Sequence, residues 1–96
     1  MIKHIVCWKL KEENKEENCR KIKQMLEDLI PVIKEIKSLE VGVNFNFSEN
    51  SFDLCLVSEF ESAEDLEKYK VNENHVKVSK SVRSVIEDRI SVDYNI

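Results

Sequence analysis

The 96-residue chain has little glycine, proline or cysteine, and it lacks long apolar runs. Its only glycine and only proline, Gly42 and Pro31, leave no segment with the composition of a linker, so we expect one domain over residues 1–96. The three cysteines are odd in number and lack C-x-x-C spacing, which argues against a disulfide framework or a zinc site. No apolar stretch approaches the length of a signal peptide or a membrane span, so we expect a cytoplasmic protein without a membrane partner.

An excess of positive charge is lacking as well. The formal net charge is -4, and the basic residues of KEENKEENCRKIKQ are interleaved with acidic ones, which is typical of a solvated helix face. We therefore expect no nucleic-acid partner. The sequence has no phosphate-binding loop and no glycine-rich nucleotide-binding motif, which argues against nucleotide binding. It also lacks the Ser/His/Asp pattern of a catalytic triad, which argues against triad-type hydrolysis.

The chain does contain periodic apolar patterns. Residues 2–10 alternate, which predicts a strand with one face made of Ile2, His4, Val6, Trp8 and Leu10. Apolar residues at helical spacing predict a helix from about Lys15 to Ile30. Pro31 should end it, leaving VIKEIKSL as a short connection.

The second half predicts a hairpin, two helices and a last strand. The hairpin combines residues 40–48, in which Val41, Val43, Phe45 and Phe47 alternate, with the turn ENS and a strand at residues 52–60. Ser62 should cap a helix with an inward face of Ala63, Leu66 and Tyr69. A helix is favoured for residues 75–88, although their valines also suit a strand, and residues 89–96 alternate as a strand does.

This order of elements predicts an α+β fold of the ferredoxin-like type, an antiparallel sheet with helices on one face. The other face would carry Ile5, Cys7, Cys55 and Val57, and a solvated sheet face is normally more polar than that. The simplest cover for so small a chain is a second copy related by a two-fold axis. We therefore predict a homodimer.

Four segments, taken together, resemble the stress-responsive dimeric A/B barrel domain family. They span almost the whole chain and read HIVCWKL, VGVNF, FDLCLVSEFESAEDLEKY and VDYNI. The resemblance implies two ferredoxin-like subunits packed sheet to sheet into a dimeric α/β barrel. The family segment after the second helix usually reads tyrosine, two residues, histidine, proline, one residue, histidine. Tyr69 and His75 match it here, whereas Asn72 and Glu73 replace the first histidine and the proline.

The only two histidines are predicted to border one pocket between sheet and helices. His75 shares a helix face with Val78 and Val82, and His4 lies on the helix-facing side of its strand. A neutral imidazole can take a proton from an activated carbon, and a tyrosine hydroxyl can polarise the adjoining carbonyl. We therefore predict His75, His4 and Tyr69 as catalytic residues, with Tyr69 at the pocket rim and Trp8 as a ligand contact. The chemistry suits a cofactor-independent aldol-type cyclisation or isomerisation of a small-molecule ligand, and the resemblance implies polyketide-cyclase-like activity.

The same residues also fit a structural role. His75 would then be satisfied by backbone groups at a helix start, His4 by a neighbouring side chain, and Tyr69 and Trp8 would fill the core. The alternative function is accordingly a non-catalytic dimer whose stability is its contribution under stress. A cavity that reaches both histidines favours a binder or enzyme, and a sealed interior favours the structural protein.

Metals and cofactors find little support in the sequence. The two histidines lack H-x-x-H or H-x-x-x-H spacing, so no zinc site is predicted, and Asp93 with a backbone carbonyl would make at most a weak magnesium site. A haem-degrading activity would rest on fold analogy alone, which is weak evidence.

Overall fold

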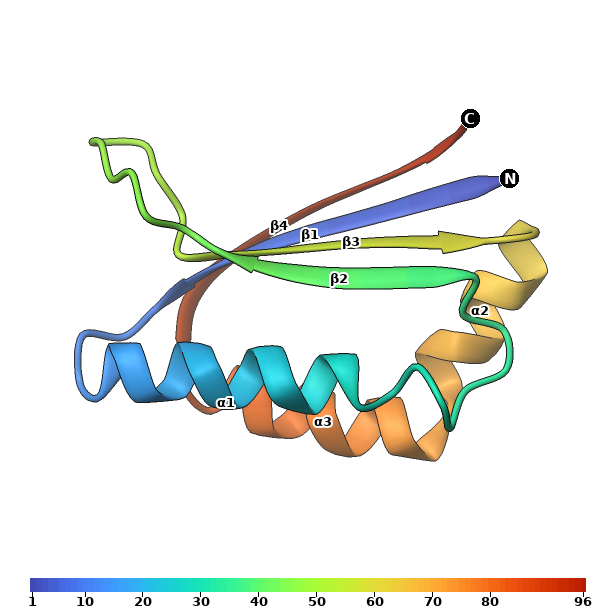
Figure 1. Cartoon of the computed structure of the whole chain (residues 1–96), viewed down its shortest axis with the longest axis horizontal. Coiled ribbons are helices and arrows are strands. Elements are labelled where there is room, and N and C mark those ends of the chain that lie inside the picture. Colours follow the sequence, from blue (N-terminus) through green and yellow to red (C-terminus); the bar gives the residue numbers. More distant parts are fainter.

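The structure consists of two layers, a four-stranded antiparallel sheet and three helices that lie on one face of it (Figure 1). The computed structural model describes all 96 residues. In chain order the elements are β1 (Ile2–Leu10), α1 (Lys15–Glu27), β2 (Ser38–Val43), β3 (Leu54–Phe60), α2 (Ala63–Val71), α3 (Glu73–Arg83) and β4 (Ile86–Asn95). The strand order in the sheet is β2-β3-β1-β4, so the predicted α+β ferredoxin-like fold is confirmed.

Strand β1 lies in the middle of the sheet, between β3 and β4. Its burial alternates along its whole length, and the buried side chains are Ile2, His4, Val6, Trp8 and Leu10, as predicted. Residues opposite one another in an antiparallel pair point to the same face. On β4 the partners of His4 and Trp8 are Asp93 and Arg89, so β4 presents polar side chains on the helix side of the sheet.

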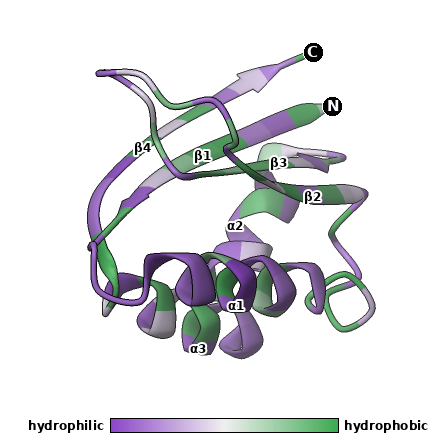
Figure 2. Cartoon of the chain, turned by 60° about the vertical axis from the view of Figure 1, so that its left-hand side comes forward, coloured by the Kyte–Doolittle hydropathy of each residue, from purple (hydrophilic) through white to green (hydrophobic).

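The hydrophobic core fills the space between the sheet and the helices. Helix α1 contributes Cys19, Ile22 and Leu26, spaced to form one face, and α3 contributes Val82. Figure 2 shows the outward side of α1 as largely hydrophilic, whereas β2 and β3 carry hydrophobic stretches. Each fully buried aliphatic side chain contributes about 1.5–3 kcal/mol relative to an exposed one, so this shared core is what holds the helices under the sheet.

Helix α1 ends at Glu27, earlier than the predicted Ile30. Beyond it, the amides of Leu29 and Ile30 bond to the carbonyls of Leu26 and Glu27 at 3.1 and 3.2 Å, which is the tighter turn common at helix ends. Pro31 disfavours helical geometry at the residue before it, so the helix gives way upstream of the proline. The connection that follows is anchored by Ile33 and Ile36, both buried.

The predicted strand over residues 40–48 is wrong in its second half, because β2 ends at Val43. Phe45 and Phe47 lie in the loop to β3 with 93% and 61% of their surface exposed. Side-chain bonds to the backbone replace the sheet ladder here: the amide of Asn46 donates to the Asn44 side chain at 2.8 Å, and the Asn44 amide group donates to the Phe52 carbonyl at 2.8 Å. In Figure 1 this loop projects beyond the sheet, away from the helices.

Helices α2 and α3 follow each other with only Asn72 between them. The Ser62 hydroxyl accepts from the amide of Asp65 at 3.2 Å, as the cap prediction required, and Asn72 caps α3 by accepting from the amide of Asn74 at 2.9 Å. The predicted helix over residues 75–88 is thus confirmed as far as Arg83. It is wrong for residues 86–88, because β4 begins at Ile86. Ala63, predicted to face inward, is exposed because it lies in the first turn of α2, beyond the edge of the core.

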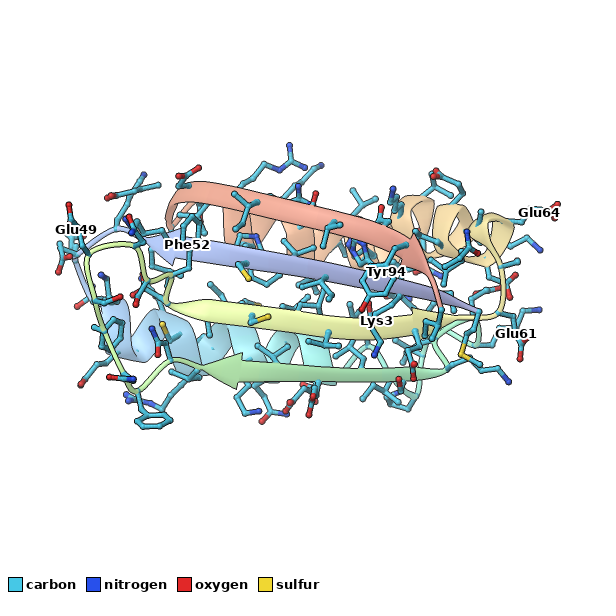
Figure 3. All side chains as sticks on the ribbon, turned by 90° about the horizontal axis from the view of Figure 1, so that it is seen from above. Lys3, Glu49, Phe52, Glu61, Glu64 and Tyr94 are labelled. Carbon is cyan, nitrogen blue, oxygen red and sulfur yellow. The ribbon has the colours of Figure 1, made fainter.

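The second face of the sheet carries no helix, as Figure 3 shows from above. Ile5 and Cys7 lie opposite Val57 and Cys55 on one side and opposite Val92 and Ile90 on the other. Val92 and Ile90 are 52% and 54% exposed. This face is therefore more apolar than the sequence pattern of β1 and β3 had indicated, because β4 adds to it. No helix in the structure has the length and apolarity that crossing a membrane requires.

Candidate active site

A cavity of about 330 Å³ lies between the sheet and helices α2 and α3. Strand β1 contributes His4, Val6 and Trp8, and the helices contribute Tyr69 and His75. All four residues predicted for the site therefore line the same cavity. Its volume is at the lower end of the range of about 300–1,000 Å³ for small-molecule pockets, so it suits a compact ligand.

His75 is the third residue of α3, where the turn from α2 brings its ring over the cavity. Its Nδ1 lies 3.0 Å from the backbone carbonyl of Lys70. Because a carbonyl oxygen only accepts, Nδ1 carries the proton, and Nε2 of the neutral ring keeps its lone pair. Burial lowers the pKa of His75 from its ordinary 6.5, and the positive charges of Arg89 and Lys70 act in the same direction against the carbonyl bond. The ring is therefore neutral at pH 7.

Tyr69 packs against His75 with ring centroids 4.3 Å apart. Its side chain is completely buried, and its hydroxyl has no hydrogen-bond partner in the protein. Burial raises the pKa of Tyr69 to about 12, so the hydroxyl stays protonated and acts as a donor. The predicted position at the pocket rim is wrong, because Tyr69 also packs against Phe60, at 4.9 Å between centroids, and this contact holds it deep in the core.

His4 faces the same cavity from β1, and its ring centroid is 6.2 Å from that of Tyr69. Only 5% of the residue is exposed. Its Nδ1 forms a short contact with a carboxylate oxygen of Asp93, the residue opposite it on β4, and the other Asp93 oxygen lies 3.9 Å from Nζ of Lys70. Asp93 thereby fixes the orientation of the imidazole, a common role for a carboxylate beside histidine.

Three polar residues of the cavity escaped the sequence prediction: Ser79, Arg83 and Arg89. Two of them had a visible signal, because Ser79 and Arg83 follow His75 by four and eight positions and so share its helix face. Arg89 and the orienting carboxylate of Asp93 are found only from the register of β1 against β4. Sequence periodicity does not supply that register.

The arrangement combines a neutral base, a buried neutral donor and an oriented second imidazole. No group of three or more metal-ligating side chains converges anywhere in the structure. Chemically, such a site can accept a proton at Nε2 of His75 while the Tyr69 hydroxyl donates a hydrogen bond to an adjoining oxygen. Trp8, only 6% exposed, supplies an apolar wall next to Val6.

The fold has well-matched relatives among solved structures. A protein from Bacteroides fragilis, described as dimeric, ferredoxin-like and of unknown function, is 32% identical and superposes with a TM-score of 0.90 over 99% of this chain and 95% of its own. A hydroxynitrile lyase from Passiflora edulis is 18% identical, with a TM-score of 0.88 over 99% and 92% of the two chains. A Dabb family protein from Mesorhizobium loti is 17% identical, with a TM-score of 0.82 over 99% and 95%.

One of two sequence comparisons agrees with this likeness to solved structures. No curated protein matches the sequence significantly. Residues 2–96, however, match a family described as the Stress responsive A/B Barrel Domain, or Dabb. The resemblance inferred from the four sequence segments is therefore confirmed. This chain belongs to the stress-responsive A/B barrel domain family.

Proposed function

We propose that this protein is a homodimeric, cofactor-independent enzyme that moves a proton at a carbon next to a carbonyl group, as in an aldol-type cyclisation or an isomerisation. One observation carries the proposal. Tyr69 and His75 line the same cavity with their rings in contact, and the Tyr69 hydroxyl is buried without a hydrogen-bond partner. Buried polar groups are nearly always paired, so an unpaired donor on a residue that lines the cavity fits a ligand oxygen that completes it.

The chemistry follows from the two protonation states. His75 accepts the carbon-bound proton at Nε2, and the electron pair of the broken C–H bond moves to the carbonyl oxygen. The Tyr69 hydroxyl donates to that developing oxyanion without losing its proton, because its pKa of about 12 keeps it neutral. In an isomerisation the enolate is conjugated with a double bond, and the imidazolium returns the proton to the far carbon of that system while the carbonyl re-forms. In a cyclisation the enolate carbon attacks a second carbonyl, and the imidazolium gives its proton to the resulting alkoxide, which restores neutral His75.

His4 acts as the positioning residue in this scheme. Asp93 holds it through Nδ1, so Nε2 is the ring atom left to contact a ligand. The backbone of His4 is held as well, since the Ser58 hydroxyl donates to its carbonyl oxygen at 3.1 Å. A rigid second contact restricts the substrate to the orientation in which its carbon faces His75.

Two further observations support an enzyme over a non-catalytic stress-response dimer. The interior is not sealed, because the cavity of about 330 Å³ reaches both histidines. In addition, the Passiflora edulis relative is named a hydroxynitrile lyase, so this fold hosts an enzyme elsewhere. At 18% identity that name says nothing of the reaction here.

The homodimer is proposed from the open sheet face. Ile5, Val57, Ile90 and Val92 form an apolar surface there, and the Bacteroides fragilis relative is described as dimeric. Packing two such faces gives a dimeric α/β barrel and leaves the cavity accessible, because the cavity lies on the helix side. Cys7 and Cys55 face each other on this surface as free thiols, which suits the reducing cytoplasm.

Exchange of hydrogen for deuterium next to a ketone tests the proposal without knowledge of the substrate. The probes are 3-benzoylpropionate and its methyl ester, incubated with the whole protein in D2O and followed by proton NMR. We expect faster exchange than in buffer for at least one probe, and loss of that excess in His75→Ala. Exchange at the buffer rate for both, or a rate that His75→Ala leaves unchanged, would contradict the proposed function.

A further inference from the structure

The residues that line the cavity include two arginines and no carboxylate, although the Asp93 carboxylate contacts the lining residue His4. Arg83 and Arg89 are among its lining residues, and no aspartate or glutamate is. The chain as a whole has 19 acidic residues against 15 Lys and Arg, so acidic side chains are not scarce. Their absence from this lining leaves the two guanidinium groups as its only permanent charges.

Neither arginine of the cavity is neutralised by another part of the protein. The ion pairs of the structure involve lysines and His4, and neither Arg83 nor Arg89 is within 4.0 Å of a carboxylate. The only side-chain partner of Arg83 is the Ser79 hydroxyl, at 3.5 Å from Nη2, and Ser79 lines the same cavity. The guanidinium groups thus keep most of their donors available to a ligand.

The arginines and the proposed catalytic pair are attached at different points along the elements that border the cavity. Along α3, Arg83 follows His75 by eight residues, which corresponds to about 12 Å of helix. Arg89 is paired with Trp8, four residues along β1 from His4, which corresponds to about 13 Å of strand. The backbone of both elements therefore runs the same way, with His4 and His75 at one end and the backbone positions of Arg83 and Arg89 towards the other. The charge of Arg89 still acts on His75, whose pKa it lowers.

We infer that the substrate is a carboxylate-bearing ketone, whose carboxylate is bound by Arg83 and Arg89 while its carbonyl lies against Tyr69 and His75. This inference rests on the proposed function for the reacting end, and on the two arginines for the charged end. The planar guanidinium group matches a carboxylate in two parallel hydrogen bonds, so it fixes direction as well as position. A molecule held at its charged end presents its ketone to the base in one orientation only.

Binding of a charged and an uncharged form of one ketone tests the inference. The probes are 3-benzoylpropionate and its methyl ester, titrated calorimetrically into the whole protein at low salt. Both share the aryl ketone, and only the first carries a carboxylate. The variants are Arg83→Gln, Arg89→Gln and the double substitution, with Arg20→Gln on exposed α1 surface as the matched control. Circular dichroism verifies that each variant is folded.

We expect the acid to bind at least about tenfold more tightly than the ester, which corresponds to about 1.4 kcal/mol. The double variant should remove that preference, Arg20→Gln should keep it, and added salt should weaken it because both arginines are exposed. Equal binding of acid and ester, no binding of the acid at millimolar concentration, or a preference that survives the double variant would each overturn the inference. Acid binding through the arginines without deuterium exchange would instead overturn the proposed function and leave the carboxylate site standing.

Discussion

The rings of Tyr69 and His75 are in contact, with their centroids 4.3 Å apart and their planes tilted by 44°. The Nδ1 proton of His75 is donated to the Lys70 carbonyl, and the buried hydroxyl of Tyr69 has no hydrogen-bond partner. A ring that carries a base and a ring that carries a donor are thus in contact, and each has one unused hydrogen-bonding atom. This relationship is the basis of the catalytic predictions, and each of them can be separated from a purely structural role.

Replacing His75 should remove the exchange activity while preserving the fold. General-base catalysis contributes about 10²–10⁴-fold, so His75→Ala should lower the exchange rate by that factor. His4→Ala should lose less, because His4 positions the substrate and accepts no proton. Lys77→Ala, at an exposed position of the same helix, is the matched control and should retain the wild-type rate. A larger loss in His4→Ala than in His75→Ala would assign the base to His4.

The exchange rate should rise with pH and reach its plateau below neutrality. Only the neutral imidazole accepts a proton, and burial lowers the pKa of His75 below 6.5. Tyr69 of α2 packs against the ring, and the charges of His4 on β1, Arg89 on β4 and Lys70 on α2 also disfavour its protonation. A profile of kcat/KM between pH 4.5 and 8 measures this directly. A midpoint above 6.5 would show that another group titrates.

The same lowered pKa makes a prediction about stability. In the unfolded chain His75 titrates at its ordinary 6.5, so between that value and the folded pKa the unfolded state binds more protons. Stability against urea should therefore be fully present above pH 6.5 and fall as the pH drops through this window. His75→Gln should flatten that part of the pH dependence, which urea unfolding at several pH values between 5 and 7.5 would reveal.

Tyr69→Phe should separate activity from stability. An unpaired buried polar group costs about 1–3 kcal/mol, so removing the hydroxyl should stabilise the protein by about 1 kcal/mol. For a domain of this size the melting temperature would rise by about 4–8 °C. The exchange rate should nevertheless fall by about 10²-fold or more, because the oxyanion loses its donor. A melting temperature that drops markedly would mean that the hydroxyl has a structural partner.

Much of the fold could be predicted from the sequence because burial in β1 and α1 follows strict periods of two and 3.6 residues. The loop with Phe45 and Phe47 could not, because apolar alternation continues there while Asn44 diverts the backbone through its side chain. A hydrophobic pattern does not show where side-chain hydrogen bonds to the backbone replace those of the sheet.

Some residues of the candidate site could be predicted from the sequence and others could not. His4, Tyr69, His75 and Trp8 were found from faces of single elements, and the structure places all of them in one cavity. Asp93 and Arg89 belong to the site through strand pairing, a relationship between residues at opposite ends of the chain. The depth of Tyr69 also escaped prediction, because it depends on contact with Phe60 from another element.

The last prediction concerns the open sheet face. Val57 lies near its centre, opposite Ile5, whereas Val71 is 74% exposed at the end of α2, on the helix layer. Val57→Lys should place an unpaired charge in the dimer interface, where desolvation costs several kcal/mol, and so raise the dimer dissociation constant by about a hundredfold or more. Val71→Lys adds the same charge outside the interface and should leave the dimer intact. Light scattering at micromolar concentration should then give a dimer mass for the wild type and Val71→Lys, and a lower mass for Val57→Lys. A wild-type monomer would refute the dimer, and an unaffected Val57→Lys dimer would place the interface on another face.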